Sequence, residues 1–268
     1  MIYVDKNKKE DTIGFNVVSD LHMDFYFDWK NPYDYIHDFK NNIENKCDYL
    51  IVAGDIANNN KLSYIFLESM NYFYKKVFVI DGNHEYYGEW VKVDRYKGLK
   101  EITKKLKNVV FLDENDVIDV EGIKIAGRMM MYNIEDRLKD YQFFKTISND
   151  SRFIPEWMVK KKHKEEIEDY NRLIDDVDIF ISHIPLIPQK NSNYIPEEYR
   201  DISLYYNSGV KIKANKIYIN GHVHHRQFNT IPLYENNEYI GESYNINVAT
   251  GYPHENKSNK PHIESIYI

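Results

Sequence analysis

The chain has 268 residues, 43% of them hydrophobic and 29% charged, which is ordinary for a globular protein with a full core. Its formal net charge of −7 argues against broad electrostatic attraction to nucleic acid, so a nucleic acid is expected only as a locally held substrate. The single cysteine, Cys47, excludes an internal disulfide and a thiolate zinc cage, so imidazole, carboxylate and amide groups must bind any metal.

The N-terminus lacks the basic start and apolar stretch of a secretory signal, and no run approaches the roughly 18 apolar residues that span a bilayer. We therefore expect one domain over residues 1–268, soluble and cytoplasmic, without membrane association. No obligate protein partner is indicated.

The first part of the chain alternates predicted strands and helices. Apolar runs predict strands at Gly14–Val18, Tyr49–Ala53 and 77–80, and helical spacing predicts helices at 33–45, 62–74 and 90–107. This repeated unit of strand, loop and helix is typical of a largely parallel sheet.

The rest of the chain returns to strands after one different stretch. Short strands are predicted at 109–112, 117–120 and 123–126, with turns at 113–116 and 121–122. Residues 128–176 are mostly helical in pattern, rich in both charge signs and without a metal-ligand pattern, so we interpret them as a helical insert near the active-site mouth. Strands resume at 179–181, 217–219 and 238–250.

Five short segments that follow predicted strands carry metal-binding side chains. They are Ser19-Asp20-Leu21-His22, Gly54-Asp55, Gly82-Asn83-His84-Glu85, Ser182-His183 and Gly221-His222-Val223-His224. Open α/β sheets bind ligands beyond the carboxyl ends of their strands, so these side chains are expected to meet. One block alone is a weak signal, but five in this order predict a two-metal hydrolase.

Spacing predicts how the ligands point. Asp20 and His22 are separated by one residue, so in an extended strand end both project to the same side and can bind one ion. The same holds for His222 and His224. Asp55 has two carboxylate oxygens and can bridge two cations, and the preceding glycine permits the required turn.

The remaining ligands and the catalytic group follow from residue chemistry. The Asn83 amide oxygen is a neutral ligand, and His183 can supply another imidazole. Mixed nitrogen and oxygen ligation suits manganese, iron or zinc better than calcium and does not choose among them. We expect two divalent ions, Mn²⁺ first, with Fe, Zn, Ni or Mg as alternatives. His84 points away from Asn83 in an extended segment, which leaves it free to act as a general acid.

At these residues the chain resembles the calcineurin-like metallophosphoesterase superfamily, whose pattern is Asp-X-His, Gly-Asp, Gly-Asn-His-Asp/Glu, His and Gly-His-X-His. All five blocks are present in order between Val18 and His224. Among its members the chain looks most like the small single-domain prokaryotic and phage enzymes. The resemblance implies an α/β fold, a four-layer α/β/β/α sandwich.

The resemblance also implies a set of roles. One metal would be held by Asp20, His22, Asp55 and His224, the other by Asp55, Asn83, His183 and His222, with His84 as the catalytic histidine. The stretch from Gly54 to Asn60 lacks the arginine that phosphoprotein phosphatases of the superfamily carry there, which argues against protein dephosphorylation.

Substrate contacts are expected at three further residues. Asn58 follows the bridging aspartate, although Asn also suits a turn. Arg128 follows a predicted strand, and His254 is next to the Gly251-Tyr252-Pro253 turn. Tyr86 and Tyr87 could stack on a base, but core packing is the favoured interpretation in a chain with 24 tyrosines.

The sequence thus predicts a dinuclear metal-dependent phosphoesterase acting on a phosphomonoester or phosphodiester. A metal-bridging hydroxide would attack phosphorus, with Asp55 and His84 as catalytic residues. The substrate could be a nucleotide or an oligonucleotide. One alternative is a nuclease acting on DNA or RNA, which needs a basic groove that tracks phosphates. The other is a metal-binding protein without catalytic activity.

Overall fold

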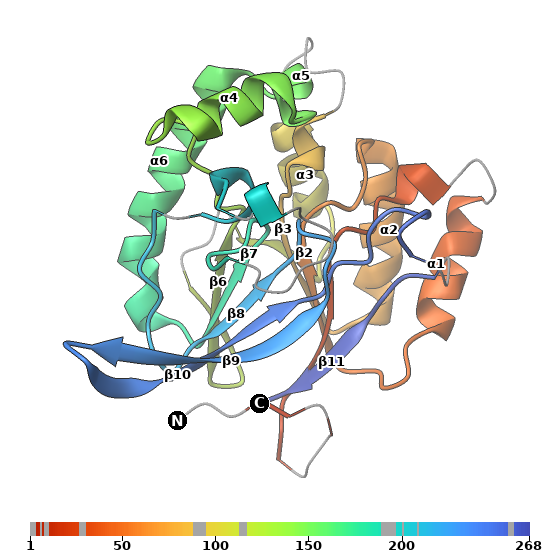
Figure 1. Cartoon of the computed structure of the whole chain (residues 1–268). Helices are drawn as coiled ribbons and strands as arrows, with labels where there is room; N and C mark the ends of the chain where they lie inside the picture. Colours follow the sequence, from red (N-terminus) through yellow and green to blue (C-terminus); the bar gives the residue numbers. More distant parts are fainter. Residues whose placement is uncertain are drawn as a thin grey trace.

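The computed structural model describes residues 4–5, 7, 11–26, 31–87, 95–112, 117–188, 197–199, 201–207, 209–256 and 260–268. Two sheets pack face to face, and helices cover their outer faces (Figure 1). The predicted four-layer α/β/β/α sandwich is therefore confirmed. The start of the predicted helix at 90–107 and the predicted turn at 113–116 lie outside the described residues.

The first sheet has the strand order β11-β1-β2-β3-β4. Strands β1 to β4 are parallel, and β11 pairs antiparallel with β1. Its strands are β1 (Gly14–Val18), β2 (Tyr49–Ala53), β3 (Lys76–Ile80), β4 (Val109–Phe111) and β11 (Glu264–Tyr267). The predicted strand positions are confirmed, except that β11 was not predicted.

Three helices connect the parallel strands of this sheet. They are α1 (Pro32–Asn41), α2 (Asn60–Phe73) and α3 (Arg95–Lys104). Asn31 caps α1 and is followed by a proline in the first helical turn. The Asn59 side chain accepts from the Lys61 backbone N–H at 2.8 Å. Both helices thus begin with residues that satisfy N–H groups left free at a helix start.

The second sheet has the strand order β5-β6-β7-β8-β10-β9. Its four central strands are parallel, and an antiparallel strand lies at each edge. The strands are β5 (Ile118–Val120), β6 (Ile123–Arg128), β7 (Ile179–Ser182), β8 (Ile217–Asn220), β9 (Gln227–Glu235) and β10 (Glu238–Asn247). Strand β9 was not predicted, because it contains Pro232 and several polar residues; an edge position tolerates this proline.

The stretch 128–176 is largely helical, as predicted, but one of its helices belongs to the sandwich. It contains α4 (Leu138–Thr146), α5 (Asp150–Phe153), α6 (Glu156–Leu173) and the short 3-10 helix η5 (Ile174–Asp176). Helix α6 connects β6 to the parallel β7 and packs Tyr170 and Leu173 against Phe180 of the sheet. The region that stands apart from the sheets is therefore narrower than predicted, and it contains α4 and α5 (Figure 1).

Alternation along the strands divides the core into layers. In β2, Leu50 and Val52 pack with the helices, whereas Tyr49, Ile51 and Ala53 pack between the two sheets. Successive strand residues point to opposite faces, so a strand buried on both sides is apolar throughout. Among the described residues, no helix combines the length and apolar character needed to cross a bilayer.

Replacing Phe66 by alanine tests the helix layer of the core. Phe66 is fully buried on α2 and meets the Phe39 ring edge-on at 5.2 Å. We expect Phe66→Ala to lower the free energy of unfolding by about 3–5 kcal/mol in a denaturant titration. Tyr72→Ala, at a position 83% exposed on the same helix, is the control and should change it by no more than about 0.5 kcal/mol. Equal effects of the two variants would contradict this packing.

Candidate metal centre

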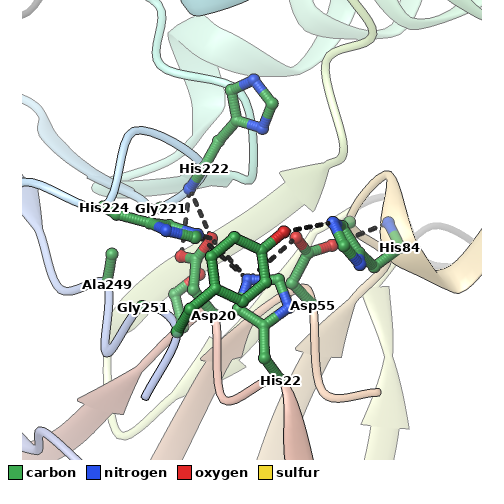
Figure 2. Close-up of polar contacts among 12 residues, drawn as sticks. Asp20, His22, Asp55, His84, Gly221, His222, His224, Ala249 and Gly251 are labelled. Carbon is green, nitrogen blue, oxygen red and sulfur yellow. Dashed lines mark hydrogen bonds and ion pairs between the residues drawn. The ribbon is translucent and has the colours of Figure 1, made fainter. Parts of the chain in front are cut away.

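Loops from both sheets deliver the predicted ligands to one place, and Figure 2 shows Asp20, His22, Asp55 and His224 together there. The segments after β1, β2 and β3 come from the first sheet, and those after β7 and β8 come from the second. Asp20, His22 and His183 are fully buried there, and Asp55 is nearly so. The structure therefore brings together side chains separated by up to about 200 positions in the sequence.

The first implied ligand set is compact. His224 Nε2 lies 3.2 Å from Asp20 Oδ1 and 3.0 Å from His22 Nε2. The ligand atoms of these three side chains all lie within 4.8 Å of one another. The second carboxylate, Asp55, is close as well, with Oδ2 at 3.8 Å from His22 Nε2.

The second implied set surrounds the Asn83 amide. Asn83 Oδ1 lies 3.0 Å from His183 Nε2 and 3.1 Å from His222 Nδ1. Asp55 Oδ2 is 3.3 Å from His183 Nε2, so Asp55 borders both sets. Ligands bound at right angles to an ion at about 2.1 Å lie about 3.0 Å apart. The donor atoms therefore fit a pair of divalent cations in type and spacing.

Outer contacts decide which imidazole nitrogen faces the centre. The N–H of His183 Nδ1 donates to the Ala53 carbonyl at 2.8 Å, and that of His222 Nε2 donates to the Leu204 carbonyl at 2.8 Å. A carbonyl oxygen only accepts, so the opposite nitrogen of each ring faces the centre and is the one that would bind a cation. His224 Nδ1 contacts Glu255 Oε2 at 2.6 Å in the same manner. Glu255 carries no local sequence signal, and sequence reasoning missed it.

The sequence interpretation assumed an extended backbone in the ligand loops, but the backbone there is not extended. Asp20, His22, Asp55 and His222 all have left-handed φ values, of 52°, 41°, 56° and 65°. A non-glycine residue held there costs on the order of 1–3 kcal/mol. The prediction that simple strand alternation aims these side chains is wrong; tight turns aim them instead.

Gly221 is required because the β8 loop passes directly over Asp20. The backbone N–H of His222 donates to both Asp20 carboxylate oxygens at 3.0 Å (Figure 2). A Cβ at Gly221 would overlap Ser19 Oγ and Asp20 Oδ2. Only a residue without a side chain permits this approach.

Glu85 ties two ligand loops together. Its buried carboxylate accepts from the backbone N–H of Gly82 at 2.6 Å, of Asp55 at 2.8 Å and of Ile56 at 2.9 Å. Three donors to one carboxylate form strong charge-assisted bonds. The last residue of the Gly-Asn-His-Glu block therefore holds the loops in register.

Charges inside the centre shift pKa values in opposite directions. Burial raises the pKa of Asp20, but the hydrogen bond from His224 and the charge of His183 outweigh it and lower the pKa to about 2. Burial lowers the pKa of His183 and of His224, but neighbouring carboxylates dominate. Asp55 raises the first pKa to about 9, and Asp20 with Glu255 raises the second to about 10. A cation bound by these rings must displace their protons.

His84 lies beside the centre, held on three sides. The N–H of Nδ1 donates to Asn58 Oδ1 at 2.8 Å, since an amide oxygen only accepts. Its Nε2 faces the Tyr252 hydroxyl at 3.1 Å, and its ring stacks on Tyr87 at 4.1 Å. Burial lowers the pKa of His84. His84 begins a 3-10 helix, η2 (His84–Tyr86), so the predicted extended segment is wrong.

Two of the three expected substrate residues have other roles. Asn58 gives its amide oxygen to His84. Arg128 is buried at the end of β6, where its Nε donates to Asp169 Oδ2 on α6 at 2.7 Å and its Nη1 donates to the Leu112 carbonyl at 3.1 Å. Arg128 thus has protein partners under α6 and is not among the described residues that line the cavity over the centre, and its contact with substrate stays a prediction.

His254 is exposed near the centre, whereas Tyr87 is packed between two other rings. His254 is 78% exposed and stacks at 5.6 Å on the ring of Tyr252, which borders the centre. Both faces of Tyr87 are covered, by His84 at 4.1 Å and by Phe153 at 4.5 Å. Tyr87 therefore has no free face on which a base could stack, and packing is its role.

A cavity of about 220 Å³ opens over the centre. One side is formed by predicted site residues and the other by the α4–α5 region and two further loops. Its lining residues are Asp55, Asn83, His84, Tyr87, Phe143, Ile147, Ser148, Asn149, Asp150, Leu204, Tyr205, His222, His224 and Tyr252. None of these described residues is lysine or arginine. The α4–α5 wall comes from a stretch in which the sequence showed no ligand pattern.

Comparison with known proteins gives a consistent result. The family model of calcineurin-like phosphoesterases matches residues 14–226. An uncharacterized protein of Acanthamoeba polyphaga mimivirus is 28% identical over 148 residues, which is 50% of this chain and 52% of that protein. The chain thus spans about half the length of this curated relative.

One solved structure shows the same fold. The crystal structure of a phosphopantetheinyl hydrolase from Mycobacterium tuberculosis aligns with a TM-score of 0.67 at 17% identity, over 95% of each chain. A dimetal phosphatase from Danio rerio aligns with a TM-score of 0.47 at 12% identity, over 94% of this chain and 91% of its own.

Gly221→Ala is expected to weaken metal binding, because the added methyl group must displace Asp20. We expect Mn²⁺ affinity, measured by isothermal titration calorimetry, to fall by about 10-fold or more. Gly122→Ala is the control: its φ of 93° strains a side chain, but nothing lies within 4 Å of the added carbon. Undiminished affinity in Gly221→Ala would show that the loops do not pack as described.

Metal binding is expected to release protons. The pKa values of His183 and His224, about 9 and about 10, lie above pH 7.5, so both rings hold a proton there until a cation displaces it. Mn²⁺ binding should release about two protons per chain and tighten as the pH rises toward those values. Calorimetry in two buffers of different ionisation enthalpy counts the protons. A count near zero would contradict the charge state assigned to the two rings.

Proposed function

Because the chain belongs to the calcineurin-like phosphoesterase family, we propose that it is a dinuclear metal-dependent hydrolase of small phosphoesters. One observation carries the proposal. Seven buried or half-buried ligand side chains converge at mutual distances suited to two cations, directly beside His84 and under one cavity.

The two cations would be held as the sequence implies. Asp20, His22 and His224 would bind one, Asn83, His183 and His222 the other, and Asp55 both. When bound, the pair supplies Lewis acidity, which activates water and neutralises charge on the transferring phosphoryl group. The ligands mix imidazole nitrogen with carboxylate and amide oxygen, which suits manganese, iron or zinc better than calcium, and we take Mn²⁺ as the ion to test first.

His84 is the group that would protonate the departing oxygen. Asn58 fixes Nδ1–H, so Nε2 is the nitrogen that exchanges a proton with the cavity. The stack on Tyr87 holds the ring orientation. Burial lowers the pKa of His84 in the free protein, and an anionic phosphoryl group beside the ring would favour its protonated form. Binding of the anionic substrate would thus favour the protonated His84 that acts as the general acid.

The cavity favours a small ester. A cavity of about 220 Å³ holds many water molecules, each of which needs about 10–15 Å³ of such space, so it has room for a phosphoryl group and a modest leaving group. Phe143, Ile147, Leu204 and Tyr205 offer apolar surface to that group. A nuclease would need a series of cationic side chains along the phosphate path, and the described lining residues include no lysine or arginine.

The test is a Mn²⁺-dependent assay on p-nitrophenyl phosphate and bis-p-nitrophenyl phosphate. We expect His84→Ala to lower kcat by about 10²- to 10⁴-fold while both metals stay bound. Asp55→Asn should lose metal and turnover together. His37→Ala, an exposed histidine on α1, is the matched control and should retain activity.

The assay also separates the alternatives. Preferential diester cleavage would identify a phosphodiesterase, and preferential monoester cleavage a phosphatase. Full turnover by His84→Ala would remove the proposed acid. Wild-type protein that binds two metals and hydrolyses neither ester would shift the proposal toward a binding protein.

A further inference from the structure

A buried carboxylate outside the ligand blocks reaches the metal centre. Asp150, the first residue of α5, is 4% exposed and comes from the wall of the cavity opposite the ligand loops. Its Oδ1 accepts from Asn83 Nδ2 at 2.9 Å, and its Oδ2 accepts from the Tyr132 hydroxyl at 2.7 Å. The Tyr87 hydroxyl also donates to Oδ1. The Asp150 carboxylate thus accepts three hydrogen bonds, one from an amide and two from tyrosine hydroxyls.

The contact with Asn83 decides which way the amide faces. The amide carries an oxygen that can bind a cation and an NH₂ group that cannot. A carboxylate only accepts hydrogen bonds, so the NH₂ group must face Asp150. The oxygen is thereby turned toward His183 Nε2 at 3.0 Å and His222 Nδ1 at 3.1 Å. With the amide reversed, the NH₂ group would point at the ligand nitrogens and exclude a cation.

We propose that Asp150 is a positioning residue that completes the second metal position by fixing the orientation of the Asn83 amide. This inference rests on the metal pair of the proposed function. The hydroxyls of Tyr87 and Tyr132 donate to the same carboxylate, so the amide of Asn83 and two phenol groups hold Asp150 in place.

The same carboxylate connects the metal position to the acid. Tyr87 donates to Asp150 while its ring lies between His84 and Phe153, which is also on α5. One turn of helix thus holds a metal ligand through Asp150 and the ring stacked on His84 through Phe153. We therefore expect loss of the Asp150 carboxylate to lower the affinity for the second cation more than the affinity for the first.

The test compares two isosteric substitutions at buried aspartates in the same helical region. In Asp150→Asn the side-chain amide can both donate and accept hydrogen bonds, so it no longer fixes which way the Asn83 amide faces. Asp140→Asn is the matched control: Asp140 is 1% exposed on α4 and bonds Arg137 and the backbone of Ser203. We expect Asp150→Asn to bind the second Mn²⁺ about 10- to 100-fold more weakly and the first normally, and Asp140→Asn to bind both normally.

Two readouts that do not depend on turnover measure the effect. Calorimetric titration gives the two affinities, and electron paramagnetic resonance reports the exchange-coupled Mn²⁺ pair, whose signal should be lost in Asp150→Asn at Mn²⁺ concentrations that fill both sites of the wild type. Asp150→Ala, which removes the acceptor altogether, should weaken the second site at least as much. Circular dichroism melting shows whether each variant is folded.

Wild-type affinity for both ions in Asp150→Asn and Asp150→Ala would overturn the inference. Equal losses in Asp150→Asn and Asp140→Asn would also overturn it, since they would report general loosening of the helical region. Failure of the proposed function is distinguishable: wild-type protein that binds two ions but hydrolyses neither test ester would refute the hydrolase and leave the role of Asp150 intact.

Discussion

The burial of two carboxylates among four imidazoles is the constraint on which the rest of the site depends. Removing a carboxylate from water costs several kcal/mol unless charge and hydrogen bonds replace the solvent. Asp20 and Asp55 receive that replacement from imidazoles and from backbone N–H groups of His222 and His84. The pKa of His183 and His224 rises because the same carboxylates attract protons. A cation can replace those protons, so the same buried carboxylates are balanced by protonated imidazoles in the free protein and would be balanced by metal ions in the loaded one.

The sandwich makes this arrangement possible because its two sheets supply ligand side chains from opposite sides of the site. The first sheet supplies both carboxylates and the second supplies three of the four imidazoles, so opposite charges meet only when the sheets pack. Carbonyl groups of the loops then hold the rings: Ala53 binds His183 and Leu204 binds His222. The strained turns at Asp20 and Asp55 persist because Glu85 and the N–H groups around them over-determine the backbone.

What the sequence could and could not predict follows from the range of each interaction. The ligand blocks are local and follow apolar strands, so their residues and their meeting point were predictable. Their backbone was not, because left-handed turns depend on contacts such as the Glu85 carboxylate. The partners of Arg128 were not predictable, because strand position alone does not reveal a contact with α6. Asp150, Tyr252 and Glu255 act on residues 30 to 170 positions away and carry no local pattern.

The wall opposite the ligands gives the metals a further role. The described lining of the cavity contains carboxylate, amide, hydroxyl and aromatic groups but no lysine or arginine. An anionic phosphoryl group there would find its positive partners in the cation pair and in protonated His84. Asp150, another negative charge in that wall, would repel the phosphoryl group if it were not bound to its three donors. Those donors spread the charge of the carboxylate, and the proposed cation pair would supply the positive charge that binds the substrate as well as the charge that promotes its hydrolysis.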